Sequence, residues 1–448
     1  MGTERALRQS LTVSKLVILS FVSIVAITLI LCVGSKAYSD VSPGDVIDKT
    51  NYEKIEGLVP DRMLAWVKDG KYVLNVGELN YDPAESISPF AREAMEKNVG
   101  KYDINNEGTI VESGSGNQAR AIIGHPFPKI DMGDPEAARK LLYDALYSRL
   151  LQGSVRFAAM RAYYMGASSV ERELSLLFKV FAFTGYPGAK DIDNPQKYEQ
   201  LGIFKVTDPY DIAGTAILFW RFFGEKKDVS YGYLPGIRRV RRMTPANRSD
   251  SIFGTDYSID DAGYSSYDGK IPYFDWKILA EKEALGMYLG PNQVALTHNE
   301  DGEWSASTET NPIRFGFETE GWTGSIWAPT NVIVVKRPVY LVQGIAKDPY
   351  YNYGPQTLWI DKEFYCGYYK EISDRAGKEW KMLHNVWTGA ISADDTNRIV
   401  LYPSGTMVDE RYNHTTVWDF YYSQSPWVTM ARDNINDYSL GGFVRFCK

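Results

Sequence analysis

Beyond residue 154, the pattern of apolar and polar positions is typical of β-strands. Six segments are rich in aromatic or β-branched residues and are bounded by Gly or Pro. They are residues 155–165, 171–184, 215–223, 339–344, 356–361 and 418–422. This succession of segments predicts a large sheet.

Two helices are expected before these strands. Asp134, Pro135 and Glu136 supply an N-cap, a proline in the first helical turn and an early acid. Apolar residues then recur at helical spacing, at Leu141, Leu142, Ala145 and Leu146, before the stop at Gly153. The pair Ser88-Pro89 opens a shorter helix in the same way. A few helices followed by many strands favour an α+β fold, mainly antiparallel, with the helices on one side of the sheet.

The segment 215–223 is apolar on both faces, whereas an ordinary antiparallel strand turns one polar face to water. We expect one face to contact a packing layer through Ile217 and Phe219, and the other to line an apolar cavity. The candidate cavity residues are Leu218, Trp220, Phe222, Tyr231 and Tyr233. Register is not visible from the sequence, so the two faces are interchangeable. A central strand of a plain sandwich is the alternative interpretation.

The N-terminus carries an export signal. Arg5, Arg8 and Lys15 precede an uncharged apolar run over residues 16–33, and small residues flank Tyr38 just before Asp40. We therefore expect a signal peptide over residues 1–39 and a periplasmic body over residues 40–448. The run is close to the length of a membrane span, so an uncleaved anchor is the alternative. Lipid attachment at Cys32 is disfavoured by the bulky Leu31.

Composition narrows the classes of partner. A net charge of −7 and a single short basic motif exclude a nucleic-acid binder. The expected periplasmic body has two cysteines, Cys366 and Cys447. In an oxidising compartment they could form a disulfide, and two buried thiols are equally compatible with the sequence. The 31 Tyr and 11 Trp suit half-buried sheet surfaces and ligand-lined walls.

No catalytic motif is found. Nucleophile-elbow, zinc-protease, Cys-x-x-Cys, phosphate-loop and dinucleotide patterns are absent from the sequence. The histidines lie far apart, at His125, His298, His384 and His414. Glu171 and Glu173 flank Arg172 and are interpreted as a solvated strand end. We expect no enzymatic activity, metal or cofactor, with a periplasmic hydrolase as the least favoured alternative.

Residues 231–277 hold the only dense charge motif. Arginines at 238, 239, 241 and 242 are followed by acids at Asp250, Asp256, Asp260 and Asp261. We expect Arg239 and Arg241 to form ion pairs with these acids and to pin a long loop to the sheet. A binding site for an anionic headgroup at the mouth of a cavity is the alternative.

Several segments resemble known envelope proteins. The leucine-proline pair at Leu234, the paired arginines and residues 254–258 (Gly-Thr-Asp-Tyr-Ser) resemble the pattern of outer-membrane lipoprotein-sorting proteins. Residues 124–131, Asp134-Pro135, residues 337–340 and residues 360–363 extend the resemblance over nearly the whole body. More narrowly, the chain resembles the bacterial envelope family DUF1329, a domain of unknown function.

The resemblance implies a fold like that of the carriers LolA and LolB. That fold is a strongly curved, incompletely closed antiparallel barrel with helices plugging its concave side. It also implies a periplasmic carrier that transfers a lipid or other hydrophobic molecule between the inner and outer membranes. The implied partners are an inner-membrane exporter of the resistance-nodulation-division (RND) type and a porin-like outer-membrane protein. A non-enzymatic structural adaptor of an envelope complex is the rival class.

Overall fold

The computed structural model describes residues 41–243, 248–261, 263–306, 312–420 and 426–448. The expected signal peptide over residues 1–39, its cleavage site before Asp40 and the lipid-attachment candidate Cys32 lie outside the described residues. Within the described ranges, no helix has the length and apolar character needed to cross a membrane.

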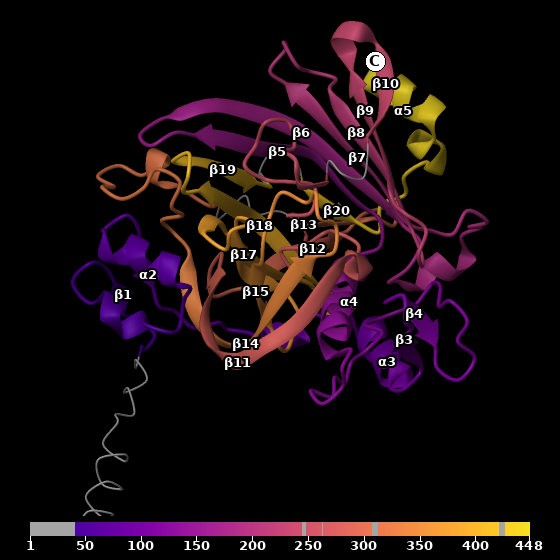
Figure 1. Ribbon diagram of the computed structural model, residues 1–448, viewed down its shortest axis with the longest axis horizontal. Coiled ribbons are helices and arrows are strands. Elements are labelled where there is room, and N and C mark those ends of the chain that lie inside the picture. The colour runs from indigo at the N-terminus through magenta and orange to yellow at the C-terminus, as the bar shows by residue number, and fades with distance from the viewer. Residues whose placement is uncertain (1–40, 244–247, 262, 307–311, 421–425) are drawn as a thin grey trace, which may run out of the picture.

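One sheet of sixteen strands organises the body (Figure 1). Its pairings are antiparallel except for two short parallel contacts that β17 makes with β11 and β12. The first strands, β5 to β10, are Val155–Met165, Val170–Ala182, Tyr198–Asp208, Ala216–Phe222, Val229–Leu234 and Arg239–Met243. The next, β11 to β15, are Phe274–Tyr288, Val294–His298, Trp304–Ala306, Ile333–Ala346 and Gln356–Asp361. The last, β16 to β20, are Gly367–Ser373, Glu379–Ser392, Arg398–Asp409, His414–Asp419 and Trp427–Thr429.

Two closed rings of strands share β17. In the first ring, β17 is followed by β16, β15, β14 and β11, and the parallel contact of Met287 with Val386 returns it to β17. In the second ring, β17 is followed by β18, β19, β5, β20, β13 and β12 before it returns to β17. Ring closure leaves these strands with few unpaired edges.

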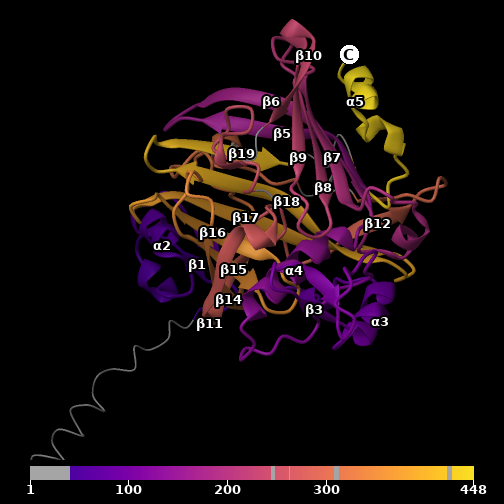
Figure 2. The same cartoon turned by 45° about the vertical axis from the view of Figure 1, so that its right-hand side comes forward.

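The remaining strands form an open extension. From the far edge of β5 the sheet continues through β6, β7, β8, β9 and β10 in chain order, and β10 is its free end. This extension, which we call the hook, rises from the rings and ends in a projecting hairpin (Figures 1 and 2). The sheet is therefore strongly curved and incompletely closed, as the family resemblance implied.

Four helices are described at the margins and in the core. They are α2 (Asp61–Lys68), α3 (Pro89–Asn98), α4 (Ala137–Leu150) and α5 (Leu440–Cys447). Two small antiparallel pairs accompany the N-terminal helices. Strand β1 (Val46–Ile47) pairs with β2 (Leu74–Asn75) across α2, and β3 (Tyr102–Ile104) forms a hairpin with β4 (Ile110–Glu112). Of these helices α4 is the most enclosed, because eleven of its fourteen residues are buried. Helix α5 instead covers the outer face of the hook.

The six segments predicted as strands all overlap strands of the sheet, namely β5, β6, β8, β14, β15 and β19, whereas β7 and the remaining strands were not predicted. Strands β5 and β15 have the predicted bounds, and β6 and β8 differ from theirs by one or two residues. Helix α4 begins at Ala137, where the Asp134 carboxylate accepts a hydrogen bond from the Glu136 amide at 2.8 Å. The segment predicted at 418–422 is the end of β19, which begins earlier, at His414; residues 421–425 lie outside the described part.

His384 of β17 lies deep in the core. Its ring packs against Trp66, Tyr72 and Trp327, with centroid distances of 6.1, 5.6 and 5.9 Å. Neither ring nitrogen has a hydrogen-bond partner among the described residues. Burial lowers the pKa of His384 to about 3, because a charged imidazole would have to be desolvated.

Replacing His384 with Phe is expected to remove part of the acid sensitivity of folding. In the unfolded chain the His384 imidazole takes up a proton near pH 6.5, whereas in the folded chain it stays neutral until the pH falls to about 3. The neutral His384 therefore costs the folded state nothing above about pH 6.5. Below that pH, the free energy of unfolding falls by up to about 1.4 kcal/mol per pH unit. Urea denaturation at about pH 7.5 and about pH 4.5 should show a wild-type loss that exceeds the variant's by about 2 to 3 kcal/mol. Equal losses would contradict this account.

Candidate functional site

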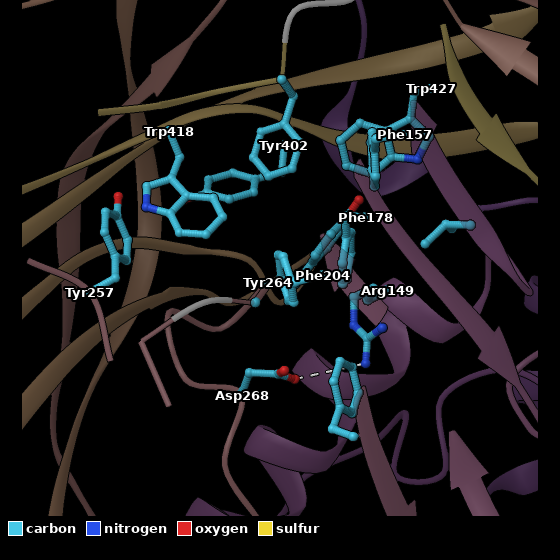
Figure 3. Close-up of a pocket in the computed structure, with 14 residues that line it drawn as sticks. Arg149, Phe157, Phe178, Phe204, Tyr257, Tyr264, Asp268, Tyr402, Trp418 and Trp427 are labelled. Atoms are coloured by element: carbon cyan, nitrogen blue, oxygen red, sulfur yellow. Dashed lines mark ion pairs between the residues drawn. The ribbon is translucent and has the colours of Figure 1, made fainter. Parts of the chain in front are cut away.

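An apolar cavity lies where the hook leaves the rings (Figure 3). The sheet contributes Val155, Phe157, Phe178, Phe204, Phe219, Tyr402, Trp418 and Trp427 to its lining, and Phe420 follows β19 directly. Helix α4 contributes Arg149, and the loop between β10 and β11 contributes Tyr257, Gly263, Tyr264 and Asp268. We call the described residues 248–261 and 263–270 of this loop the capping loop. Aromatic side chains therefore form most of the wall.

A ladder of phenylalanines forms the hook side of the cavity. Phe157 of β5 is the direct register partner of Phe178 of β6, and Phe178 is the partner of Phe204 of β7. Direct partners point to the same face of a sheet, so the three rings stack, with centroid distances of 5.7 and 4.1 Å. Phe178 and Phe204 are only half-buried. The rings thus present apolar surface to the cavity.

Phe219 of β8 extends the ladder. Its register partner on β7 is Gly202, and a Cβ at that glycine would lie 2.0 Å from the Phe219 ring. The Phe219 ring therefore occupies the space that a side chain at residue 202 would fill. This arrangement brings Phe219 flat across β7 and next to the other phenylalanines.

Rings from the end of the chain form the opposite side. Trp418 of β19 meets Phe204 edge-on at 5.9 Å, and Trp427 of β20 meets Phe157 edge-on at 4.2 Å. Phe420 lies between Trp427 and Tyr402, at 5.6 and 5.2 Å. Trp418 is 4% exposed, and its indole N–H has no hydrogen-bond acceptor among the described residues.

The cavity is narrow. The space between its walls is about 690 Å³, part of which is open to solvent. A molecule inside would contact aromatic rings on several sides, which is typical of sites that bind apolar ligands. Without a ligand, the same rings would face water, which is unfavourable for apolar surface.

One end of the cavity is polar. Arg149 and Asp268 approach to 3.8 Å there, and burial lowers the pKa of Arg149 (Figure 3). Asp268 also accepts a hydrogen bond from Arg221 at 3.2 Å, and Arg221 donates to Asp228 at 3.1 Å. Arg248 continues this series of buried charges from Asp228 to Asp260. Each charge in the series has an opposite partner, so the network can be buried at tolerable cost.

A second buried pair holds the capping loop to the first ring. The Lys370 ammonium of β16 donates to the Asp261 carboxylate at 2.6 Å, and both side chains are 0% exposed. Asp261 also accepts hydrogen bonds from the Ser258 amide and the Tyr353 hydroxyl, at 2.7 and 2.9 Å. Although burial favours the neutral acid, Lys370 keeps the pKa of Asp261 below its usual value. The loop is thus fixed over the cavity by ionic contacts.

The predicted partners of these acids need correction. Arg239 and Arg241 lie exposed on β10, and the structure pairs Asp260 with Arg248 and Asp261 with Lys370 instead. Asp256 contacts His414 and Thr416, each at 2.7 Å, and Asp250 accepts a hydrogen bond from Asn352. The physical reason is that β10 is the free end of the hook, whereas the acids fold back over the rings. The acids do pin the loop, but through other partners.

The predicted cavity face of β8 also needs correction. Leu218, Trp220, Phe222, Tyr231 and Tyr233 do not line the cavity, which Phe219 does. Leu218, Trp220 and both tyrosines pack under α5 and the residues before it, where the Trp220 indole donates to the Tyr438 carbonyl at 2.8 Å. Phe222 stacks on Tyr198 of the same outer face, at 5.0 Å. The register exchanges the two faces, because the C-terminal helix covers the side that the sequence assigned to the ligand.

The other candidates stay apart. Cys366 and Cys447 are both free and buried, Cys366 in the main core and Cys447 at the end of α5, in the cluster between this helix and the hook. Glu173 pairs with Arg161 at 3.2 Å, and Glu171 lies 3.7 Å from His414. Within the described ranges, no group of three or more His, Cys, Asp or Glu side chains is arranged to hold a metal ion.

Comparison with protein families places the chain. The profile of the family described as "Protein of unknown function (DUF1329)" matches residues 46–440. The chain belongs to the DUF1329 family. This confirms the resemblance drawn from the sequence motifs. No curated protein matches this DUF1329 chain.

Three solved structures are similar in fold to the DUF1329 chain. A domain from Vibrio parahaemolyticus named for outer-membrane lipoprotein sorting is 15% identical, with 70% of this chain and 100% of that chain covered and a TM-score of 0.46. A DUF1329 family protein from Desulfovibrio piger is 16% identical, with coverage of 69% and 98% and a TM-score of 0.43. A LolA superfamily protein from Nitrosomonas europaea is 13% identical, with coverage of 68% and 98% and a TM-score of 0.38.

Proposed function

We propose that the protein is a non-enzymatic periplasmic carrier that holds a lipid or another hydrophobic molecule in the aromatic cavity. The observation that supports this proposal is the phenylalanine ladder of β5 to β8, which faces Trp418 and Phe420 across a narrow space and whose rings at Phe178, Phe204 and Phe219 are half-buried. Affinity in such a site comes from buried hydrocarbon, at about 0.8 kcal/mol per CH₂ group. The carrier needs no catalytic residues for this task.

The polar end of the cavity fits an amphiphilic cargo. Arg149 and Asp268 lie at one end, while rings such as Phe157 and Trp427 lie away from them. A molecule with one polar end and one hydrocarbon part satisfies both regions, because a buried charge remains costly unless it has partners. Transfer between the inner and outer membranes, with an RND-type exporter and a porin-like outer-membrane protein as partners, extends the proposal on the strength of the sequence resemblance alone.

Mass spectrometry of material extracted from the purified protein tests the proposal. The protein is isolated from cells without detergent, washed, and extracted with organic solvent. We expect a defined lipid or other apolar molecule in an amount close to one per protein chain. A protein that carries nothing, and that also fails to bind an apolar fluorescent probe, would favour a structural adaptor instead.

A further inference from the structure

The free end of the hook is a projecting hairpin whose turn carries exposed side chains, as does its outer strand, β10. Strands β9 and β10 pair with each other, and among the described residues no strand pairs with the outer edge of β10. The short helix Pro235–Ile237 forms the turn between them and contains no buried residue. Both ribbon views show this hairpin standing clear of the body (Figures 1 and 2).

Large apolar side chains are exposed at this end. Leu234 and Ile237 of the turn are 45% and 49% exposed, and Tyr210 of the β7–β8 loop is 96% exposed. The two loops are neighbours, since a Cβ at Gly214 would lie 3.6 Å from the Cβ of Pro235. Exposed apolar side chains gathered on two adjoining loops are typical of an interaction surface.

Four arginines follow the turn directly, at Arg238, Arg239, Arg241 and Arg242, and all are exposed. The ion pairs formed nearby use Arg221 and Arg248, and within the described part of the chain none uses these four. In the β7–β8 loop the acids are Asp208 and Asp211, and Asp211 already pairs with Arg172 at 2.9 Å. Positive charge therefore predominates at the end of the hook.

We propose that this hairpin and the adjoining loop dock onto an anionic lipid bilayer. Guanidinium groups bind phosphate through paired hydrogen bonds, while Leu234 and Ile237 are placed to enter the boundary between headgroups and acyl chains. Tyr210 suits the same depth, where aromatic residues with a polar tip gather. The order of side chains, apolar at the turn and cationic behind it, matches the order of layers in a bilayer.

The size of the surface favours a bilayer over a protein partner. A stable protein interface of standard size buries about 800 Å² on each partner around a central apolar cluster. Here the apolar part consists of three side chains on two narrow loops, and the charge is spread along one strand edge. A bilayer needs only a few inserted side chains and a diffuse positive charge, because its own charge is distributed over many headgroups.

Vesicle co-sedimentation tests the docking surface. The purified protein is mixed with vesicles of equal parts phosphatidylglycerol and phosphatidylcholine, or of phosphatidylcholine alone, at low and at high salt. The variant pair is Arg239→Gln with Arg241→Gln. Its matched control is Arg92→Gln with Arg375→Gln, which removes the same charge from exposed arginines of α3 and of the β16–β17 turn. Circular dichroism confirms that each protein is folded.

We expect the wild type to prefer the anionic vesicles, with a preference that weakens as salt screens the charges. Removing Arg239 and Arg241 should weaken this binding about 25-fold, at about fivefold per arginine, and the control should change it less than about twofold. Ile237→Ser should weaken binding to the anionic vesicles as well. An equal loss in the control pair, or no preference for anionic lipid, would overturn the proposal and assign the hairpin to a protein partner. The vesicles carry no probe for the cavity, so this result is separate from the test of the carrier function.

Discussion

Phe219→Glu is expected to abolish most binding of an apolar ligand while the protein remains folded. Phe219 lines the cavity and is only partly buried, so a carboxylate there can keep some water. The ligand would instead have to share the cavity with a charge, at a cost of at least about 2 kcal/mol, or about 30-fold in affinity. The measurement is a titration with a neutral naphthylamine dye, whose fluorescence rises in apolar surroundings.

Two further variants separate the cavity from the rest of the hook. Phe219→Leu keeps an apolar wall and should bind the dye within about threefold of wild type. Trp220→Glu introduces the same charge one residue away, but on the outer face under α5, where Trp220 donates to Tyr438. It should lower the melting temperature and leave dye affinity nearly unchanged in the folded fraction. If Trp220→Glu impairs binding and Phe219→Glu does not, the cavity has been assigned to the wrong face.

Lys370→Met is expected to destabilise the protein by about 3 to 5 kcal/mol. It leaves the Asp261 carboxylate buried without its ammonium partner, although the Ser258 amide and the Tyr353 hydroxyl still donate to it. Urea denaturation at neutral pH measures the change. The control is Lys362→Met, which removes a partly exposed lysine paired with Glu281 and should cost less than about 1 kcal/mol.

Lys370→Met should also reverse the contribution that Asp261 makes to the pH dependence of folding stability. In the wild type, Lys370 holds the pKa of Asp261 below its value in the unfolded chain. That stabilisation is present above about pH 3.8 and is lost as pH falls through the folded pKa. In Lys370→Met, burial is the dominant influence and favours the neutral acid, so the loss of stability relative to wild type should be smaller at acid pH. A constant difference across pH would contradict the assigned pairing.

Local sequence signals predicted individual helices and strands, whereas the residues that meet in the cavity are determined by contacts between distant parts of the chain. The strand over 155–165 and the helix near Asp134 both depend on nearby residues. The strand has the predicted bounds, whereas the helix begins at Ala137, with Glu136 rather than Asp134 as its N-cap. The phenylalanine ladder depends on which residues of β5, β6 and β7 lie opposite one another, which the composition of each strand does not specify. Phe157 and Phe178 fall in strands predicted from the sequence, whereas Phe204 lies in β7, which was not predicted. Both that strand and the strand registers were therefore missing from the prediction.

The partners of the capping loop show the same limit. The prediction took the partners from the arginine run, as Arg239 and Arg241, although Arg248 lies closer to the acids in the sequence and pairs with Asp260 in the structure. In the structure Lys370 of β16, more than a hundred residues away, pairs with Asp261, because the loop folds back over the first ring. Helix α5 likewise covers the outer face of β8 from the far end of the chain. Such contacts follow from topology, which one sequence does not show.

The two closed rings and the open hook differ in how easily they deform. A strand in a ring is held by hydrogen bonds on both sides, so moving it breaks two ladders, whereas the hook is attached to the rings along one edge of β5. One wall of the cavity belongs to the rings, through Trp418 and Tyr402, and the other belongs to the hook, through Phe204 and Phe219. The cavity is therefore bounded by one stiff wall and one compliant wall. Bending the hook would widen the space without breaking either ring, and one contact that it would strain is that between Arg221 of the hook and Asp268 of the capping loop.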